Sequence, residues 1–151
     1  MKANELMIGD WVMVYPWDET PWKPNKITDI NFHSWEGTDF CDSVGVEEWD
    51  ELSLDDIKPI PLTAEILKKN GFYASEVSSH HIKYVCSTGP IDEFADIVLI
   101  CGKDNKDKWR WDCLELRIHY YRGDIHQFKI NYVHELQHAL RLCGIEKEIE
   151  L

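Results

Sequence analysis

The chain has no long hydrophobic run. Its longest apolar stretch, Ile97–Cys101, has five residues, whereas a helix that crosses a membrane needs about 20. The opening Met1–Leu6 contains no apolar run of about 7–15 residues behind a basic start, as a secretory signal would. These absences argue against membrane and secretory segments and lead us to expect a cytoplasmic protein.

Basic residues are scarce. Sixteen Lys and Arg stand against 28 Asp and Glu in 151 residues, which gives a formal charge of −12. Residues 1–62 hold 14 acids and four bases, a charge of −10, and residues 63–151 hold 14 acids and 12 bases, a charge of −2. A chain of this charge repels phosphate backbones and anionic lipid. We therefore expect no nucleic-acid and no membrane partner, above all for residues 1–62.

Motifs of several common cofactor and nucleophile sites are also missing. The five cysteines lie at least a dozen residues apart, so the CxxC pair of a zinc knuckle or redox site is absent. Most are expected to be buried thiols: Cys41, Cys86, Cys101, Cys113 and Cys143. The chain has no glycine-rich phosphate loop and no G-x-S-x-G elbow. We expect no cofactor and assign no catalytic, cofactor-binding or metal-binding residue.

The chain does contain enough apolar material for a folded core. Hydrophobic residues make up 44% and aromatic residues 12%, which is too much for a disordered acidic segment. Four short segments in the first 60 residues are rich in β-forming residues. They are Leu6–Tyr15, Lys26–Phe32, Ser43–Val46 and Asp56–Ile60, with a loop at Thr20–Asn25. Their spacing predicts a small β-barrel-like, SH3-like module over residues 1–62.

Residues 63–151 combine helix and strand signals. Thr63 is placed to cap a short helix, Ala64–Asn70, that ends at Gly71. Strands are predicted at Ile82–Cys86, Ile97–Cys101, Trp109–Tyr121 and Ile125–Ile130. The last two form a predicted hairpin around Arg122–Asp124, with opposed pairs Tyr120 and His126, Ile118 and Phe128, and Leu116 and Ile130. The expected fold class is α+β, an antiparallel sheet packed with one short and one C-terminal helix.

The C-terminal helix is predicted over residues 132–143, with Asn131 as its N-cap and Gly144 after its last turn. At about 100° per residue, its apolar side chains share one arc of roughly 120°. They are Tyr132, Val133, Leu136, Ala139, Leu140 and Cys143. This stripe predicts a helix that packs on the sheet.

The same helix carries a literal H-E-x-x-H sequence, His134-Glu135-Leu136-Gln137-His138. Histidines at i and i+4 share one helical face and can bind one Zn²⁺, and the glutamate can act as general base for a zinc-bound water. Both histidines are predicted to lie away from the apolar stripe, either lining a cleft or solvated. The motif supports an alternative reading, a zinc-dependent hydrolase with His134 and His138 as ligands and Glu135 as base.

A catalytic zinc site needs a third protein ligand. The extended motif H-E-x-x-H-x-x-G-x-x-H requires glycine at 141 and histidine at 144, where this chain has Arg141 and Gly144. His119 and His126 are predicted on opposite faces of one hairpin, so they cannot serve one metal together. His80-His81 or an acidic loop residue stay open as donors. We prefer a solvated helix face to a zinc site.

Tryptophans gather in two regions. Lys103, Lys106, Lys108 and Arg110 surround Trp109 and Trp111, a pattern suited to nucleic acid, but interleaved aspartates lower the local charge to about +1. A solvated turn with two packing tryptophans is the simpler reading. The first 50 residues hold five more tryptophans, too many for a small barrel to bury: Trp11, Trp17, Trp22, Trp35 and Trp49. We expect some of them to form an exposed surface for a protein partner.

Three parts of the chain carry a resemblance. They are the opening Lys2–Val12, the middle Ile57–Thr63 with Ile66-Leu67 and Asn70–Phe72, and the end Tyr132–Leu140. Together they are similar to a family of small uncharacterised proteins from gut Bacteroides-type bacteria and their phages or mobile elements. Residues 13–56 and 73–125 carry no shared motif. The resemblance implies an intracellular protein with no assigned activity, in which the helix with the H-E-x-x-H sequence defines the fold.

These observations predict a non-catalytic intracellular binding protein of phage or mobile-element type. Its acidic, aromatic N-terminal module is the predicted surface for a protein partner. The zinc-dependent hydrolase is one alternative. The second alternative is an acidic mimic of nucleic acid, which rests on charge alone.

Overall fold

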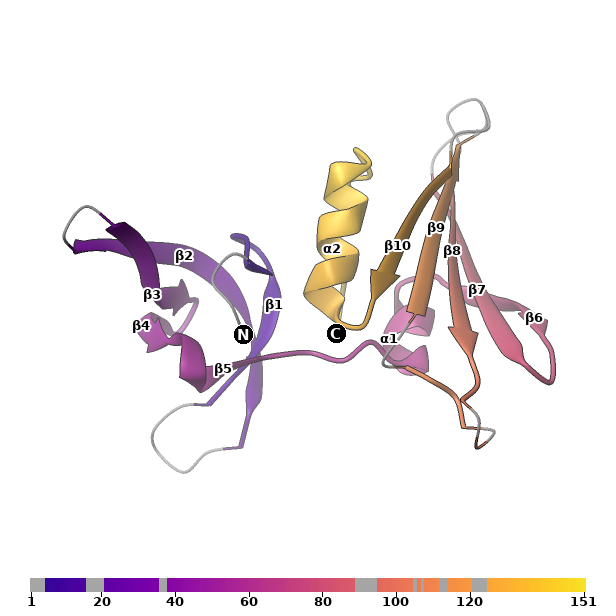
Figure 1. The fold of residues 1–151 in the computed structure, drawn as a ribbon, viewed down its shortest axis with the longest axis horizontal. Helices are drawn as coiled ribbons and strands as arrows, with labels where there is room; N and C mark the ends of the chain where they lie inside the picture. Colours follow the sequence, from indigo (N-terminus) through magenta and orange to yellow (C-terminus); the bar gives the residue numbers. More distant parts are fainter. Residues whose placement is uncertain are drawn as a thin grey trace. The chain divides into compact units, whose positions relative to one another are not determined.

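The computed structural model describes residues 5–15, 21–35, 38–88, 95–104, 106, 108–111, 114–120 and 125–151, without the side chains of 32–35, 38–42, 88, 95, 120, 125 and 126. The chain divides into two compact units, Met1–Ile60 (unit 1) and Pro61–Leu151 (unit 2); sequence alone places this boundary after residue 62. Each unit contains one antiparallel five-stranded sheet, and the fold is α+β (Figure 1). No helix in the described ranges is long and apolar enough to cross a membrane.

In unit 1 the first four strands form a meander, and the fifth returns to pair with the first. Its elements are β1 (Trp11–Val14), β2 (Lys23–Trp35), β3 (Thr38–Val46), β4 (Trp49–Ser53), the 3₁₀ turn η2 (Leu54–Asp56) and β5 (Ile57–Pro59). The strand order is β4-β3-β2-β1-β5, and every neighbouring pair is antiparallel. No ladder joins the edge strands β4 and β5 among the residues that the structure describes. The predicted barrel is therefore not confirmed.

The core of unit 1 nevertheless joins all five strands. A single cluster of buried residues contains Leu6, Val12, Val14, Ile27, Val44, Val46, Leu52 and Ile57. The register shifts between Val44 and Val46 on the β3–β4 pair, and twice along the β2–β3 pair. Such bulges bend a strand and increase its twist, which lets the two ends of the sheet contribute to one core.

The predicted first strand, Leu6–Tyr15, is too long at its start, because β1 begins at Trp11. Gly9 has a φ of +86°, a left-handed conformation that favours glycine. The Asp10 carboxylate accepts the backbone N–H of Met7 at 2.8 Å, and the Asp10 N–H donates to the Met7 carbonyl at 3.1 Å. These bonds close a tight turn where the sequence pattern alone suggests a strand.

One other prediction for unit 1 is wrong, and one strand is missing from the predictions. The loop expected at Thr20–Asn25 extends too far, since β2 begins at Lys23 and Pro24 pairs with Met13. Strand β4, with the sequence WDELS, was not expected. Acidic residues are poor strand formers on their own, so this edge strand depends on its pairing with β3.

Unit 2 contains a second meander and two helices. Its elements are α1 (Ala64–Lys69), β6 (Tyr73–Val77), β7 (His81–Thr88), β8 (Ala95–Gly102), β9 (Leu114–Tyr120), β10 (Ile125–Ile130) and α2 (Val133–Leu142). The strand order is β10-β9-β8-β7-β6, antiparallel throughout. Strand β6 is a further element that the sequence did not indicate. All five of its residues are exposed, and a bulge between Ala74 and Glu76 interrupts its ladder with β7.

The predicted β9–β10 hairpin forms, but its register is wrong by two residues. Phe128 pairs with Leu116 rather than Ile118, and Ile130 pairs with Leu114 rather than Leu116. A shift by two keeps each side chain on its predicted face, because strand side chains alternate with period two. The register follows from the length of the connecting loop, and the predicted turn Arg122–Asp124 lies outside the described residues. The predicted strand Trp109–Tyr121 shortens to β9.

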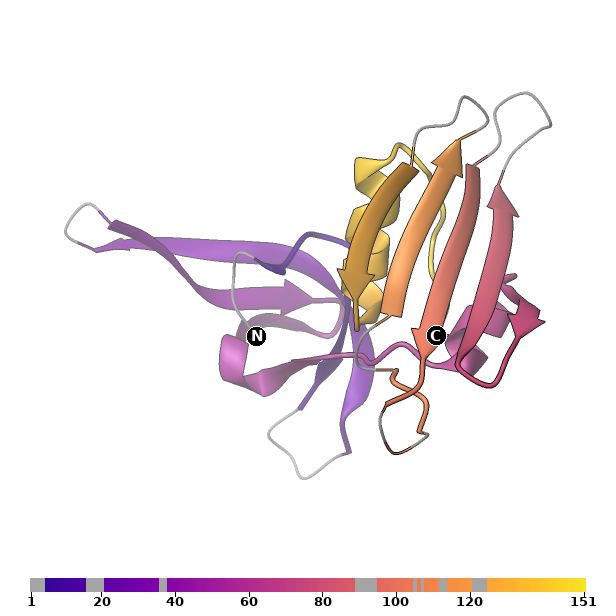
Figure 2. The same cartoon turned by 45° about the vertical axis from the view of Figure 1, so that its right-hand side comes forward.

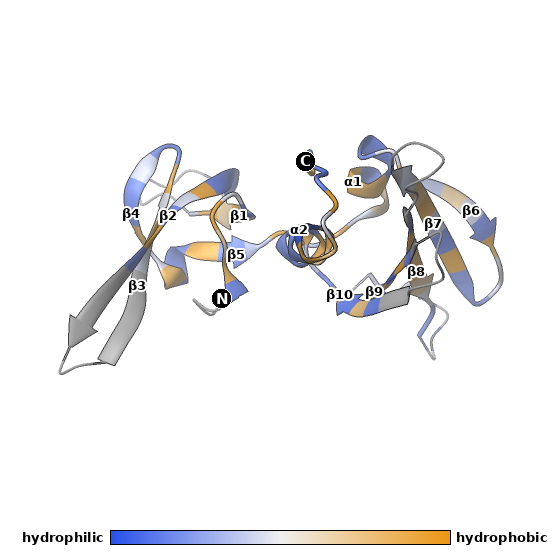
Figure 3. Ribbon diagram, turned by 90° about the horizontal axis from the view of Figure 1, so that it is seen from above, coloured by the Kyte–Doolittle hydropathy of each residue, from blue (hydrophilic) through white to orange (hydrophobic). Residues whose placement is uncertain are grey.

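One face of the unit 2 sheet is covered. Figures 1 and 2 show α1 and α2 on the same face of this sheet, and the apolar positions of the strands point to it. Figure 3 shows hydrophobic and hydrophilic positions alternating along these strands. The buried side chains of the three central strands are Tyr84, Cys86, Ile97, Leu99, Cys101, Leu114, Leu116 and Ile118.

Both helices end in the same way. Gly71 after α1 and Gly144 after α2 have φ values of +78° and +69°. Behind each glycine, the next N–H reaches back to the third-last helical carbonyl, from Phe72 to Leu67 and from Ile145 to Leu140, both at 2.9 Å. This is the Schellman arrangement, which satisfies carbonyls that a helix end leaves free. The prediction of glycine stops at 71 and 144 is confirmed.

The starts of the helices differ. Thr63 caps α1 as predicted, since its Oγ1 accepts the Ile66 N–H at 3.2 Å. The predicted cap Asn131 is wrong, because α2 begins at Val133 with Tyr132 as its N-cap. No side chain of the N-cap residue caps this helix, and Glu135 of the first turn binds backbone N–H groups at its start, as described below.

Candidate functional site

The outward side of β1 and its neighbours forms an aromatic face on unit 1. Val12 and Val14 point into the core, so the alternate residues Trp11, Met13 and Tyr15 point outward. Opposite them on β2 and just before it lie Lys26, Pro24 and Trp22, and Lys58 of β5 pairs with Met13. We define the aromatic face by these residues: Trp11, Met13, Tyr15, Trp22, Pro24, Lys26 and Lys58.

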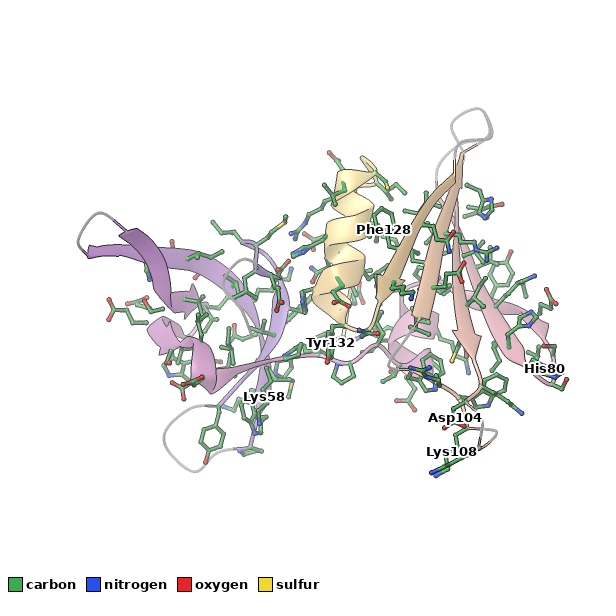
Figure 4. All side chains as sticks on the ribbon, viewed as in Figure 1. Lys58, His80, Asp104, Lys108, Phe128 and Tyr132 are labelled. Atoms are coloured by element: carbon green, nitrogen blue, oxygen red, sulfur yellow. The ribbon has the colours of Figure 1, made fainter. Side chains whose placement is uncertain are left out.

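Ring contacts order this face. The rings of Tyr15 and Trp22 lie 5.2 Å apart at an interplanar angle of 41°. The Lys58 Nζ, labelled in Figure 4, lies 4.1 Å from the centre of the Trp22 ring, and the Lys26 Nζ lies 5.1 Å from the Trp11 ring. A lysine over a tryptophan face is attracted by the ring quadrupole. The two lysines therefore hold the tryptophans in defined positions on the surface.

The predicted aromatic surface is thus present in part. Trp11, Trp22 and Trp49 are all only partly buried, and Tyr15 is 39% exposed. Of these, Trp49 packs against the unit 1 core rather than on the aromatic face. The side chains of Trp17 and Trp35 lie outside the described residues.

A group of exposed acids of unit 1 occupies a different part of it. The exposed members on the β3–β4 turn, β4 and η2 form an acidic edge: Glu47, Glu48, Asp50, Glu51 and Asp55. Strand β4 is an edge strand of the sheet, whereas the aromatic face lies on β1, β2 and β5. Among the residues that the structure describes, this acidic edge and the aromatic face are therefore two separate features, whereas the sequence alone predicts one acidic, aromatic surface.

The H-E-x-x-H histidines lie side by side on α2, as their spacing predicts. Their ring centres are 5.7 Å apart in an edge-on arrangement, at an interplanar angle of 73°. The His134 ring also stacks on Tyr132, with centres 5.8 Å apart and planes 8° from parallel. His134 is only 3% exposed. The prediction of a solvated or cleft-lining position is therefore wrong for His134, while His138 is half-buried.

Glu135 has a structural task. One oxygen of its carboxylate accepts the backbone N–H of Asn131 at 2.5 Å and that of Tyr132 at 3.1 Å. These N–H groups precede the first helical turn and have no partner inside the helix. A carboxylate at this end is also favoured by the helix dipole. Glu135 thus caps the start of α2 from within its first turn, by accepting N–H groups that precede the helix, and its carboxylate is turned toward the backbone.

No third zinc ligand accompanies the two histidines within the part of the chain that the structure describes. Those residues contain no group of three or more His, Cys, Asp and Glu placed to hold a metal ion. His119 faces away from the buried positions Leu116 and Ile118 on β9 by strand alternation. His80 and His81 lie at the β6–β7 turn, where Figure 4 labels His80.

That turn holds a polar cluster that sequence reasoning missed. The Ser78 Oγ lies 3.1 Å from the His81 Nδ1, and the His81 Nε2 lies 3.2 Å from the Glu76 Oε1. The other Glu76 oxygen accepts a hydrogen bond from Lys83. The Lys83 bond is the largest cause that lowers the pKa of Glu76, and the charges of Lys83 and His81 lower it further. The sequence signal that could have indicated this cluster is the polar run Ser-Ser-His-His between the two strands.

The serine of this cluster is not placed for nucleophilic attack. Its Oγ accepts the N–H groups of His80 at 3.2 Å and His81 at 3.0 Å, which occupies both acceptor positions of a hydroxyl. The side chains of His81 and Glu76 are 33% and 48% exposed. A turn as exposed as this one cannot exclude water from a reaction. The cluster stabilises the hairpin.

The basic, tryptophan-containing loop after β8 is ordered by an aspartate. The Asp104 Oδ1 accepts the N–H groups of Lys106 at 2.8 Å and Lys108 at 2.9 Å (Figure 4). The Lys103 Nζ lies 4.8 Å from the Trp109 ring, and the Trp111 ring lies 5.8 Å from the Tyr84 ring. Trp109 therefore packs within this loop, and Trp111 packs against Tyr84 of β7.

Unit 2 also has a shallow pocket of about 410 Å³. It is lined by Pro61, Leu62, Thr63, Ala64, Glu65 and Trp111. Glu65 is its single titratable side chain, so the pocket offers no acid–base pair, and the Thr63 hydroxyl in its lining caps α1.

Comparison with family models, with curated proteins and with solved structures gave no match for this chain. The candidate functional site is therefore defined by its geometry, and the aromatic face of unit 1 is the surface whose exposed side chains best suit recognition.

Proposed function

We propose that the protein is a non-catalytic interaction protein whose unit 1 binds a protein partner through the aromatic face. In the setting that the family resemblance implies, the protein acts inside a cell that carries a phage or mobile element. The single observation that carries the proposal is the Tyr15–Trp22 ring pair with Lys58 placed over Trp22 on an exposed sheet face.

We infer an SH3-like small barrel for unit 1. In support, five antiparallel strands follow the order β4-β3-β2-β1-β5, a 3₁₀ turn directly precedes β5, and β5 pairs with β1. One core cluster also draws on every strand. Small barrels of this kind offer aromatic surfaces for short peptide segments.

The composition of the aromatic face suits a protein partner. Tryptophan and tyrosine are the residues that most often dominate binding energy at protein interfaces. A ring already held by a neighbouring lysine loses little conformational freedom when a partner covers it. Methionine and proline, here Met13 and Pro24, add apolar area between the rings.

The acidic edge indicates the charge of the partner. A patch of five exposed carboxylates attracts basic segments and raises their rate of encounter at low salt. We therefore propose a partner segment in which lysine or arginine residues flank apolar residues or proline. The apolar part anchors on the aromatic face, and the basic part is steered by the acidic edge.

The test uses an array of synthetic peptides in which Lys and Arg alternate with Pro, Leu and Ala, with matched peptides that carry Glu in place of each basic residue. We expect the full chain to prefer the basic series. Trp22→Ala is expected to weaken binding at least tenfold, and raising the salt from about 50 to about 500 mM is expected to weaken it further.

Trp109→Ala provides the matched control. Trp109 also lies under a lysine, Lys103, but in unit 2, so its removal is expected to leave peptide binding unchanged. Equal losses for Trp22→Ala and Trp109→Ala, or no preference for the basic series, would overturn the proposal.

The two alternatives have their own tests. Stoichiometric zinc in the purified protein that disappears in His138→Ala would favour the hydrolase and sink the non-catalytic reading. Capture of a DNA-processing enzyme that moderate salt releases would favour the acidic mimic.

A further inference from the structure

The segment Ile145–Leu151 follows α2 and belongs to no helix and no strand. Figures 1 and 2 show it turning back from the end of α2 along the covered face of the unit 2 sheet, toward α1. Its burial alternates as in an extended strand: Glu146, Glu148 and Glu150 are exposed, and the residues between them are partly or fully buried. The segment therefore presents one side to the protein and a row of carboxylates to solvent.

The buried side chain of Asn70 forms hydrogen bonds with the backbone of this segment. The Asn70 Nδ2 donates to the Glu150 carbonyl at 2.7 Å, and the Asn70 Oδ1 accepts the Glu150 N–H at 2.8 Å. Asn70 is 6% exposed, and its Nδ2 is oriented by a second bond of 2.8 Å to the Ile66 carbonyl. The amide thus pairs with both polar groups of one residue, as a neighbouring strand would.

Two contacts flank this amide pair. Ile149 is 2% exposed, so its side chain is buried in unit 2. On the other side, the Lys69 ammonium donates to the Leu151 carbonyl. The site thus binds three successive residues of an extended stretch. The first is apolar, the second is bound through its backbone N–H and carbonyl groups whatever its side chain, and the third is bound through its carbonyl.

The position of the anchor favours local opening. Segments outside helices and sheets open at lower free energy than the strands that they cover. Gly144, with a φ of +69° and open space where a Cβ would lie, comes directly before the segment and can serve as its hinge. The segment can therefore leave its site while β7, β8 and β9 stay paired.

We propose that the surface formed by α1 and Asn70 is a peptide-binding site, that Ile145–Leu151 is its resident ligand, and that it takes the same segment of a second copy of the chain. The ligand class is an extended peptide with an apolar residue at the position of Ile149. Asn70 supplies recognition of the main chain, and Lys69 binds the carbonyl that follows. This inference concerns unit 2 and does not depend on the proposed function of unit 1.

The test is a titration of a fluorescent peptide with the sequence of residues 144–151 against the full chain carrying Ile149→Asp, which weakens the resident segment. We expect saturable binding that is at least tenfold weaker with the unaltered chain, because its own segment competes at high effective concentration. The same peptide with Ile149→Asp is the matched control and is expected not to bind. Adding Asn70→Ala to the protein is expected to abolish binding.

Absence of saturable binding to a folded Ile149→Asp chain, or binding that survives Asn70→Ala, would overturn the proposal. If the Ile149→Asp chain does not fold, hydrogen exchange on the unaltered chain tests the same proposal by measuring how readily the segment opens. The Glu150 amide is expected to exchange at least a hundredfold faster than the slowest amides of β8. Exchange of both only at the global unfolding rate would overturn the proposal as well.

Discussion

Unit 1 and unit 2 each bury one face of a five-stranded antiparallel sheet, but they cover that face differently. In unit 1, strands with several bulges contribute to one core among themselves. In unit 2, a more regular sheet is covered by two capped helices and the segment that follows α2. When the strands build the core among themselves, the outward residues of β1 stay partly exposed. When helices cover the sheet, the core depends on how firmly those helices are attached.

The largest expected effect comes from opening the layered core. Leu116 of β9 is fully buried, and Leu116→Ala is expected to lower the unfolding free energy of unit 2 by about 2–5 kcal/mol, because it leaves a cavity under the helices. Val12→Ala in unit 1 removes fewer atoms and is expected to cost about 2 kcal/mol. Residue-resolved hydrogen exchange in urea measures both. A larger loss for Val12→Ala would break the comparison.

Gly45 tests the curled core of unit 1. A Cβ at this position would lie 3.1 Å from the Asp29 Cβ and 3.2 Å from the Asp50 carbonyl oxygen. Gly45→Ala is therefore expected to cost about 1–3 kcal/mol, because backbone must move to accept it. Gly102→Ala on β8 is the control, since no atom lies within 4 Å of the position that its new methyl group would take, and little change is expected. Urea unfolding that gives equal costs for both variants would contradict the close packing at the β3 bulge.

Glu135→Ala tests how firmly α2 is held at its start. It removes the acceptor of two N–H groups and a charge at the start of α2, so we expect a loss of about 1 kcal/mol in thermal or urea unfolding. Glu65→Ala on α1 is the control, since Thr63 already caps that helix, and a few tenths of a kcal/mol are expected. If Glu135→Ala left stability unchanged, its capping role would be wrong.

The smallest expected effect concerns the exposed β6–β7 hairpin. The pKa of Glu76 is lowered, first by its hydrogen bond from Lys83. Its contribution to stability is therefore complete above the ordinary carboxyl pKa and is lost as pH falls through the lowered folded pKa. In Lys83→Met, we expect the pKa of Glu76 to rise toward its ordinary value in an NMR titration. Lys129→Met is the control on β10, and an unchanged Glu76 pKa in Lys83→Met would refute the assignment.

The features that sequence reasoning found are those with local causes. Thr63 and Gly71 bracket α1 because capping depends on residues within one turn of the helix. The apolar run Ile97–Cys101 falls within β8 because both the residue types and their length suit a buried strand. These signals needed no knowledge of tertiary contacts.

The features that it missed depend on distant partners. Strand β4 has three exposed polar residues, and β6 is exposed along its whole length. Their pairing with β3 and β7 is therefore what makes them strands. The capping role of Glu135 was missed because the H-E-x-x-H motif gives the same residue a role as general base in a zinc site. Likewise, the burial of His134 and the division between aromatic face and acidic edge in unit 1 arise from the folded arrangement and not from spacing along the chain.

The bulge between Ala74 and Glu76 has a consequence for solubility. Strand β6 ends the unit 2 sheet, and it carries exposed Tyr73 and Val77 without a proline or lysine. A regular edge of this kind is a template on which strands of other chains can add. The irregular ladder at the bulge and the charge of Glu76 break that template. Aggregation of the folded protein through this edge is thereby discouraged by one extra residue in a five-residue strand.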